Sequence, residues 1–250
     1  MKKVSFLLLA VFAMINIACN KTEVSEYKSS TNSFEEDYVS EQKSIMDGVK
    51  TRSSSAVLTR ADIATIAVKM DSVTMKFCNK YPELINELPK VSEEQLEVLK
   101  ENTDSLASFV QKNYSAEIVN LVKEDLGSDC FARLKPTAVP MISDVRYNRF
   151  VQANVEINRE FKVLVTENAD LTYKPLFQES NKRTDCYKRY KNKVDNCYST
   201  MVRSLVLASL SSVNPIGAIT LSLNLLYIVS DYNQCLYNAA EFYNLCNGKK

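Results

Sequence analysis

Two stretches of sequence decide the fold of this chain: CYKRYKNKVDNC at residues 186–197 and CLYNAAEFYNLC at residues 235–246. Each stretch begins and ends with a cysteine, so its two cysteines are eleven residues apart. Eleven residues make about three turns of an α-helix, which places both cysteines on one face and roughly 16 Å apart along the axis. That distance is too long for a disulfide within either stretch, so the bonds are expected to join one stretch to the other.

The two stretches lie symmetrically about residue 216, within residues 214–217, which read NPIG and are a strong turn signal. An antiparallel helical hairpin folded at this turn brings Cys186 beside Cys246 and Cys197 beside Cys235. The crossed pairing, Cys186 with Cys235, would need parallel helices. The sequence therefore predicts an outer disulfide, Cys186–Cys246, and an inner disulfide, Cys197–Cys235.

The apolar residues of both predicted helices include these cysteines and follow a heptad-like spacing. On the second helix the steps alternate between four and three residues without a break, and the first helix has a comparable stripe. The positions are Cys186, Tyr190, Val194, Cys197, Met201, Leu205 and Ala208 on the first helix, and Leu221, Leu225, Ile228, Tyr232, Cys235, Ala239, Phe242 and Cys246 on the second. The cysteines therefore lie in the predicted contact between the two helices.

Two further cysteines remain, and by elimination we expect them to form a third disulfide, Cys78–Cys130. Free buried thiols and metal ligation are the alternatives for the cysteines of this chain, although thiolates three helical turns apart do not match the close pairs of zinc sites. The paired arrangement resembles the twin-cysteine helical hairpins of small coiled-coil–helix proteins, whose spacings differ and whose loops are much shorter. This resemblance concerns geometry alone and implies no function.

Helices are also expected before the hairpin, because capping boxes and apolar periodicity recur there. Thr59 with Asp62 and Ser92 with Gln95 are such boxes, and each precedes an apolar stripe. Gly127 is a natural helix end after a third stripe.

Residues 143–165 are expected to be helical, although several of their apolar residues also follow the two-residue period of a strand. The chain has only four glycines, which disfavours the many tight turns of sandwiches and barrels. The expected fold class is all-α, a helical bundle with a long C-terminal antiparallel helical hairpin stapled by disulfides.

The N-terminus has the features of a secretory signal. Residues 1–3 read MKK, residues 4–15 are mainly apolar, and the small residue Ala18 precedes a cysteine. The apolar stretch is too short to be a comfortable transmembrane helix. We therefore expect export from the cytoplasm.

Residues 16–19 read NIAC and resemble the lipobox of bacterial lipoproteins, with Asn16 where leucine is usual. The resemblance covers only this segment. It implies cleavage before Cys19 and lipidation of Cys19. The lipid would anchor the protein in the bacterial cell envelope, and the outer membrane is the expected membrane. The serine-rich and charged segment that follows has few apolar residues and is expected to be a flexible tether. The expected organisation is a signal peptide (1–18), a lipidated cysteine and tether (19–56), and one helical domain (57–248) made of N-terminal helices (57–175) and the hairpin (180–248).

Composition excludes several kinds of chemistry. The chain has no histidine, so it has no Ser-His or Cys-His nucleophile pair and no histidine-based zinc site. Without Lys2 and Lys3 it has 29 basic and 30 acidic residues, a balance that gives no electrostatic reason to expect nucleic-acid binding. Known phosphate, dinucleotide and calcium motifs are absent. We therefore expect no catalytic residues, no metal and no cofactor, and an enzyme that uses carboxylates alone is the third hypothesis.

Residues 204–230 contain no charge, and the turn divides them into halves too short to cross a bilayer. One interpretation is a hairpin tip packed against the N-terminal helices; the other is a tip that enters a membrane or a partner's groove. Its candidate contact residues are Val213, Ile216, Ile219 and Leu223. We expect a non-catalytic binding or structural protein with a protein or glycan partner; the alternative is a membrane-active or toxin-like protein.

Overall fold

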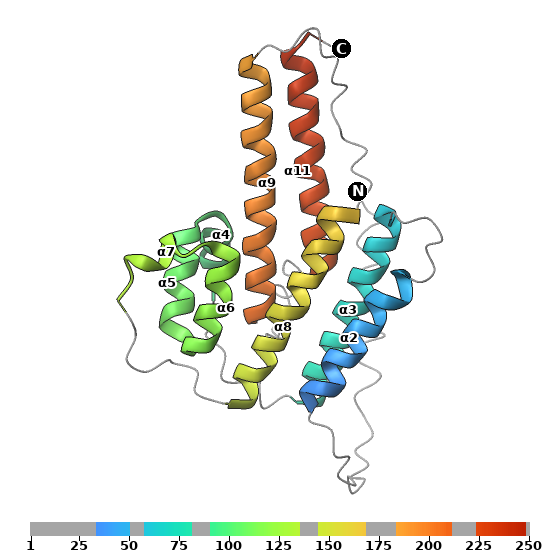
Figure 1. Ribbon diagram of the computed structural model, residues 1–250, viewed down its shortest axis with the longest axis vertical. Coiled ribbons are helices and arrows are strands. Elements are labelled where there is room, and N and C mark those ends of the chain that lie inside the picture. The colour runs from blue at the N-terminus through green and yellow to red at the C-terminus, as the bar shows by residue number, and fades with distance from the viewer. Residues whose placement is uncertain are drawn as a thin grey trace, which may run out of the picture. The chain divides into compact units, whose positions relative to one another are not determined.

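The computed structural model describes residues 34–50, 58–81, 91–135, 145–168, 184–211 and 224–248. They belong to one unit that begins at Ser33 (Figure 1). The helices are α2 (Phe34–Lys50), α3 (Arg60–Lys80), α4 (Glu93–Glu101), α5 (Thr103–Asn113), α6 (Ala116–Leu126), the short α7 (Asp129–Ala132), α8 (Val145–Val163) with a π-helical end η2 (Leu164–Asn168), α9 (Thr184–Ser211) and α11 (Leu225–Cys246). No strand occurs in these ranges, and the predicted all-α class is confirmed.

Both predicted capping boxes are present at helix starts. Thr59 and Asp62 bond reciprocally at the start of α3, and Ser92 and Gln95 do so at the start of α4. Each box satisfies backbone N–H groups that the first turn of a helix leaves without partners. Gly127 ends α6 with a φ of 88°, a left-handed conformation that a residue without a Cβ adopts at little cost. Local sequence therefore sets these boundaries.

One apolar stripe of the sequence is divided between two helices, α4 and α5. Asn102 lies at the break, where its backbone N–H donates to the carbonyl of Val98 and its side chain accepts from the N–H of Ser105. The same residue thus ends one helix and caps the next. Buried side chains such as Leu99 and Leu106 continue on both sides of the break.

α2 lies inside the stretch that the sequence analysis assigned to a tether (19–56), and this part of that prediction is wrong. α2 packs against α3 and α8 and buries Tyr38, Gln42 and Met46. These three residues are four positions apart, so they lie on one helical face. Val39 and Ile45 of the same helix are partly buried against the core as well.

The second half of α9 is the centre of the helical body. From Met201 to Leu210 every side chain except Arg203 is buried, whereas most helices bury only one stripe. α9 contacts α4, α6, α8 and α11 (Figure 1). These contacts explain why residues 204–210 of α9 carry no charge on any face.

α8 is helical, as predicted, although its sequence also has a two-residue period. Val155, Ile157 and Phe161 are buried, while Val163 is 44% exposed. Asn154 is buried as well, so side chains on more than one face of α8 are covered by other parts of the protein. A helix that is covered on several faces needs no single apolar stripe. The two-residue spacing of apolar residues in this segment is therefore compatible with a helix.

The predicted third disulfide, Cys78–Cys130, is wrong, because both residues are thiols. Cys78 is buried on α3, and burial raises the pKa of its thiol to about 12. Cys130 lies on α7, where its Sγ donates to the carbonyl of Gly127 at 2.9 Å. The elimination assumed that every cysteine of an exported protein is oxidised, whereas a buried thiol with a raised pKa reacts slowly.

Candidate functional site

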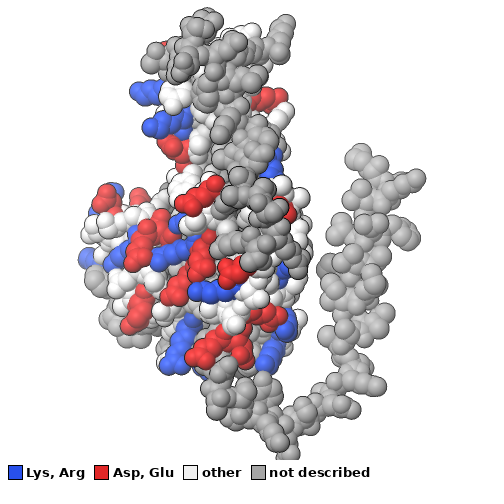
Figure 2. Space-filling model, turned by 45° about the vertical axis from the view of Figure 1, so that its right-hand side comes forward, with Lys and Arg blue, Asp and Glu red and all other residues white. Residues whose placement is uncertain are grey.

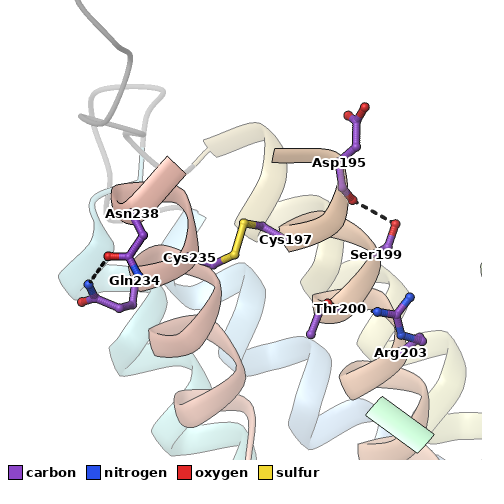
Figure 3. The surroundings of a disulfide bond; sticks show 8 residues. All are labelled: Asp195, Cys197, Ser199, Thr200, Arg203, Gln234, Cys235 and Asn238. Atoms are coloured by element: carbon purple, nitrogen blue, oxygen red, sulfur yellow. Dashed lines mark hydrogen bonds between the residues drawn. A yellow bond between two sulfur atoms is a disulfide. The ribbon is translucent and has the colours of Figure 1, made fainter. Parts of the chain in front are cut away.

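The C-terminal hairpin is joined by the two predicted disulfides, Cys186–Cys246 and Cys197–Cys235. The Cα atoms of the two pairs are 5.9 Å and 5.8 Å apart, within the usual range for disulfides. Figure 3 shows the inner disulfide between α9 and α11, which run in opposite directions. The pairing prediction is therefore confirmed.

The end of the hairpin that carries the disulfides rises beyond the other described helices, as Figure 1 shows in orange and red. We define the arm as residues 185–200 of α9 and residues 231–246 of α11. On the α9 side of the arm only Cys186 and Cys197 are buried. The exposure of α9 changes sharply at Met201, where the helix enters the body.

Aromatic contacts supplement the disulfides between the two helices of the arm. The rings of Tyr190 and Tyr243 lie 5.3 Å apart between centroids. The ammonium of Lys193 lies 4.8 Å from the centroid of the Phe242 ring, a cation–π contact. With two disulfides and two ring contacts, the arm is a rigid pair of helices.

Buried side chains of the body hold the base of α9. The carbonyl of Leu210, near the end of α9, accepts hydrogen bonds from the hydroxyls of Tyr114 at 3.1 Å and Tyr147 at 2.6 Å. Carbonyls in the last turn of a helix have no partner within it, so these tyrosines supply one. The amide of Asn158 on α8 donates to the hydroxyl of Ser209 at 2.8 Å.

Asp71 of α3 holds the base of α11 in the same way. Its carboxylate accepts from the backbone N–H groups of Leu225 at 3.0 Å and Leu226 at 3.3 Å. A carboxylate at a helix N-terminus satisfies unpartnered N–H groups and interacts favourably with the helix dipole. Burial nevertheless raises the pKa of Asp71 to about 6, against the two backbone hydrogen bonds that lower it.

Asp71 gives the protein a specific dependence of stability on pH. Because the pKa is raised in the folded state, the folded protein binds a proton more readily than the unfolded protein between pH 4 and pH 6. The free energy of unfolding should therefore fall across this window as pH rises, by at most about 3 kcal/mol. Asp71→Asn should abolish this fall, as measured by urea denaturation at a series of pH values.

Asp62 is the matched control, because it caps a helix from an exposed position. The side-chain and backbone hydrogen bonds from Thr59 lower the pKa of Asp62, so its contribution has the opposite sign and is lost as pH falls. Asp62→Asn should leave the fall between pH 4 and pH 6 in place. A fall that persists in Asp71→Asn would contradict the role of Asp71.

Arg203 attaches α9 to α4 and α5 just inside the body. Its guanidinium donates to the carbonyl of Lys100 at the end of α4 and to the hydroxyl of Thr103 at 3.2 Å. A planar guanidinium with several donors suits this bridging position between two helices. Arg203 is the one charged residue of the otherwise buried stretch of α9.

Cys19, Val213, Ile216, Ile219 and Leu223 lie outside the described residues. The parts of the uncharged stretch that are described belong mainly to the body, with buried residues from 204 to 210 and at Leu225, Ile228 and Val229. Among the described residues, the end of the hairpin that carries the disulfides is exposed on its α9 side, and the sequence did not point to it.

Charges of both signs are interspersed over the face shown in Figure 2. The arm carries a group of basic residues, Lys188, Arg189, Lys191 and Lys193, which are exposed beside Asp185 and Asp195. Mixed charge of this kind is typical of a solvated helix face.

Within the described ranges we find no cluster of carboxylates and cysteines suited to a metal ion. Among the described helices, none combines the length and apolar character needed to cross a bilayer. The disulfides indicate an oxidising compartment outside the cytoplasm. No protein-family model matches the chain, and neither a curated protein nor a solved structure shows significant similarity to it.

Proposed function

We propose that this chain is an exported, lipid-anchored protein of the bacterial cell envelope that binds a protein or glycan partner through the arm and catalyses no reaction. The signal-like N-terminus and the lipobox-like residues at Cys19 support the location. The disulfides are consistent with it, because such bonds persist in oxidising compartments.

The observation that carries the proposal is the contrast between the two ends of the hairpin. The base is buried and held by Tyr114, Tyr147 and Asp71, whereas the arm is exposed along most of its α9 side and cross-linked twice. Rigid elements that present side chains to solvent lose little conformational entropy when they bind. An arm of this construction is suited to presenting a fixed surface to a partner.

The chemistry of the buried polar groups supports a binding role over catalysis. Asp71, Tyr114 and Tyr147 have raised pKa values because of burial, and each makes hydrogen bonds that position a helix end. A perturbed pKa is a frequent sign of an active site, but structural groups also show it. These three groups serve the attachment of the hairpin.

The burial of residues 204–210 and of Leu225, Ile228 and Val229 favours binding over the membrane-active alternative. Residues that form the centre of the body would have to leave it before they could enter a bilayer. Such a rearrangement would expose a large apolar area at a cost of about 25 cal/mol per Å². The described part of the apolar stretch is better explained as core.

Site-specific photo-crosslinking in the native envelope tests the arm as the binding surface. A photoreactive phenylalanine at Tyr198 or Leu245, both exposed on the arm, should crosslink to a partner detected as a protein or glycan adduct. The same probe at Val98, exposed on α4 of the body, is the control and should give no such adduct. Adducts from Val98 alone, or from none of the three positions, would refute the proposal.

A further inference from the structure

A groove runs along one side of the arm, between α9 and α11 and beside the inner disulfide. Its lining comprises the side chains of Lys193, Asn196, Asp231, Gln234 and Asn238, together with Cys197, Cys235 and Ala239. Figure 3 shows Gln234 and Asn238 on α11, the helix that carries Cys235 of the inner disulfide, with a hydrogen bond between their side chains. Sequence reasoning missed this groove, because its residues are polar and come from two helices.

The spacing of the groove residues explains their alignment. Along α11, Tyr227, Asp231, Gln234 and Asn238 are separated by four, three and four residues, so they form one stripe. Tyr227 is 47% exposed at the end of this stripe nearer the body. From Tyr227 to Asn238 the stripe covers about 16 Å of helix axis, which is longer than one sugar ring.

The lining offers a particular set of hydrogen-bonding groups. Asn196, Gln234 and Asn238 each carry an amide that both donates and accepts. Asp231 adds an acceptor and Lys193 a donor, and their opposite charges leave the lining without net charge. Ligands rich in hydroxyl groups match this set, because each hydroxyl also donates and accepts.

Two features hold the groove in one conformation before any ligand arrives. The inner disulfide fixes the separation of its walls, with 5.8 Å between the Cα atoms of Cys197 and Cys235. The amide of Gln234 donates to the side-chain oxygen of Asn238 at 3.0 Å, which orients both groups. A site that is already ordered loses less conformational entropy when it binds a ligand. This matters most for a flexible ligand chain, which loses conformational entropy of its own.

We infer that this groove binds an uncharged glycan chain, with amides and Asp231 bonding its hydroxyls and Tyr227 stacking on a ring at one end. The inference deepens the proposed function, on which it rests, by naming the partner class. An anionic ligand would meet Asp231, and an apolar peptide helix would cover five polar side chains without satisfying them. The lining therefore favours a neutral hydroxyl-rich chain over both.

The test uses the purified full-length mature chain and an array of immobilised oligosaccharides. The array carries neutral oligomers of glucose, galactose, mannose and N-acetylglucosamine, and uronic-acid oligomers as the anionic set. We expect binding to at least one neutral oligomer, and the double variant Gln234→Ala with Asn238→Ala should weaken it about tenfold or more. Ser199→Ala, at an exposed position of α9 outside the groove lining, is the control and should leave binding within about twofold.

Three outcomes would overturn the inference. The first is that no neutral oligomer binds, and the second is that only the uronic-acid oligomers bind. The third is that the groove variant binds as well as the unsubstituted protein. If the crosslinking experiment meanwhile traps a protein at Tyr198 or Leu245, the proposed binding role of the arm stands and only its glycan specificity fails. Circular dichroism and non-reducing electrophoresis establish that each variant keeps its helices and both disulfides.

Discussion

Replacing all four disulfide cysteines with alanine should lower the free energy of unfolding by roughly 7 kcal/mol, the largest effect we expect from any change at the hairpin. The outer bridge closes a loop of 60 residues and is expected to contribute about 4 kcal/mol by restricting the unfolded chain. The inner bridge closes 38 residues and adds about 3 kcal/mol, less than it would alone because the outer bridge has already shortened its loop.

An effect of this size is comparable with the whole stability of many domains, about 5–15 kcal/mol. Urea denaturation of the four-cysteine variant should therefore show unfolding at much lower urea, and each variant that lacks one bridge should be intermediate. Cys130→Ala, which removes a partly exposed thiol, is the control and should change stability by less than about 1 kcal/mol. Equal stability of the four-cysteine variant and the control would contradict the expected role of the bridges.

Tyr38→Ala should destabilise the protein by about 3–5 kcal/mol, because it removes a fully buried aromatic ring from α2. The ring lies 4.9 Å from Phe77 and 5.0 Å from Phe150 between centroids. Its hydroxyl donates to Asn154 at 2.6 Å and accepts from Gln42 at 3.1 Å, so the variant also removes two buried hydrogen bonds.

This prediction tests whether the folded domain begins at α2 or after residue 56. If residues 34–50 were a tether, Tyr38→Ala would have no effect on thermal or urea unfolding. Tyr198→Ala, which removes an exposed tyrosine from the arm, is the matched control and should change stability by about 0.5 kcal/mol or less. Identical unfolding curves for the Tyr38 and Tyr198 variants would show that α2 does not belong to the core.

The hairpin and the helix ends could be predicted from sequence because their causes are local or periodic. The capping box of Thr59 and Asp62 involves residues three apart, and the disulfide pairing followed from equal spacing about one turn. The candidate binding surface could not be predicted in the same way. The spacing of Asp231, Gln234 and Asn238 places them on one face of a helix. The other residues that line the groove, Lys193 and Asn196, come from the other helix.

The sequence-based predictions were wrong for residues whose burial depends on parts of the chain far away in sequence. Tyr38 looked like an isolated aromatic in a polar segment, and only α3 and α8 make it a core residue. Cys78 and Cys130 remained after the other pairs were assigned, and burial rather than count decides that Cys78 stays a thiol. Asp71 caps a helix 154 residues further along the chain, a relation for which no sequence pattern exists.

The amino-acid sequence by itself determined the helical class, the starts of α3 and α4, and the antiparallel pairing of α9 with α11. These features depend on bonds within a few residues or on the 3.6-residue repeat of the helix. Only the tertiary structure decided that α2 is folded, which cysteines remain thiols, and that the disulfide end of the hairpin stands exposed. All three depend on which distant helices pack together, and no short stretch of sequence sets that packing.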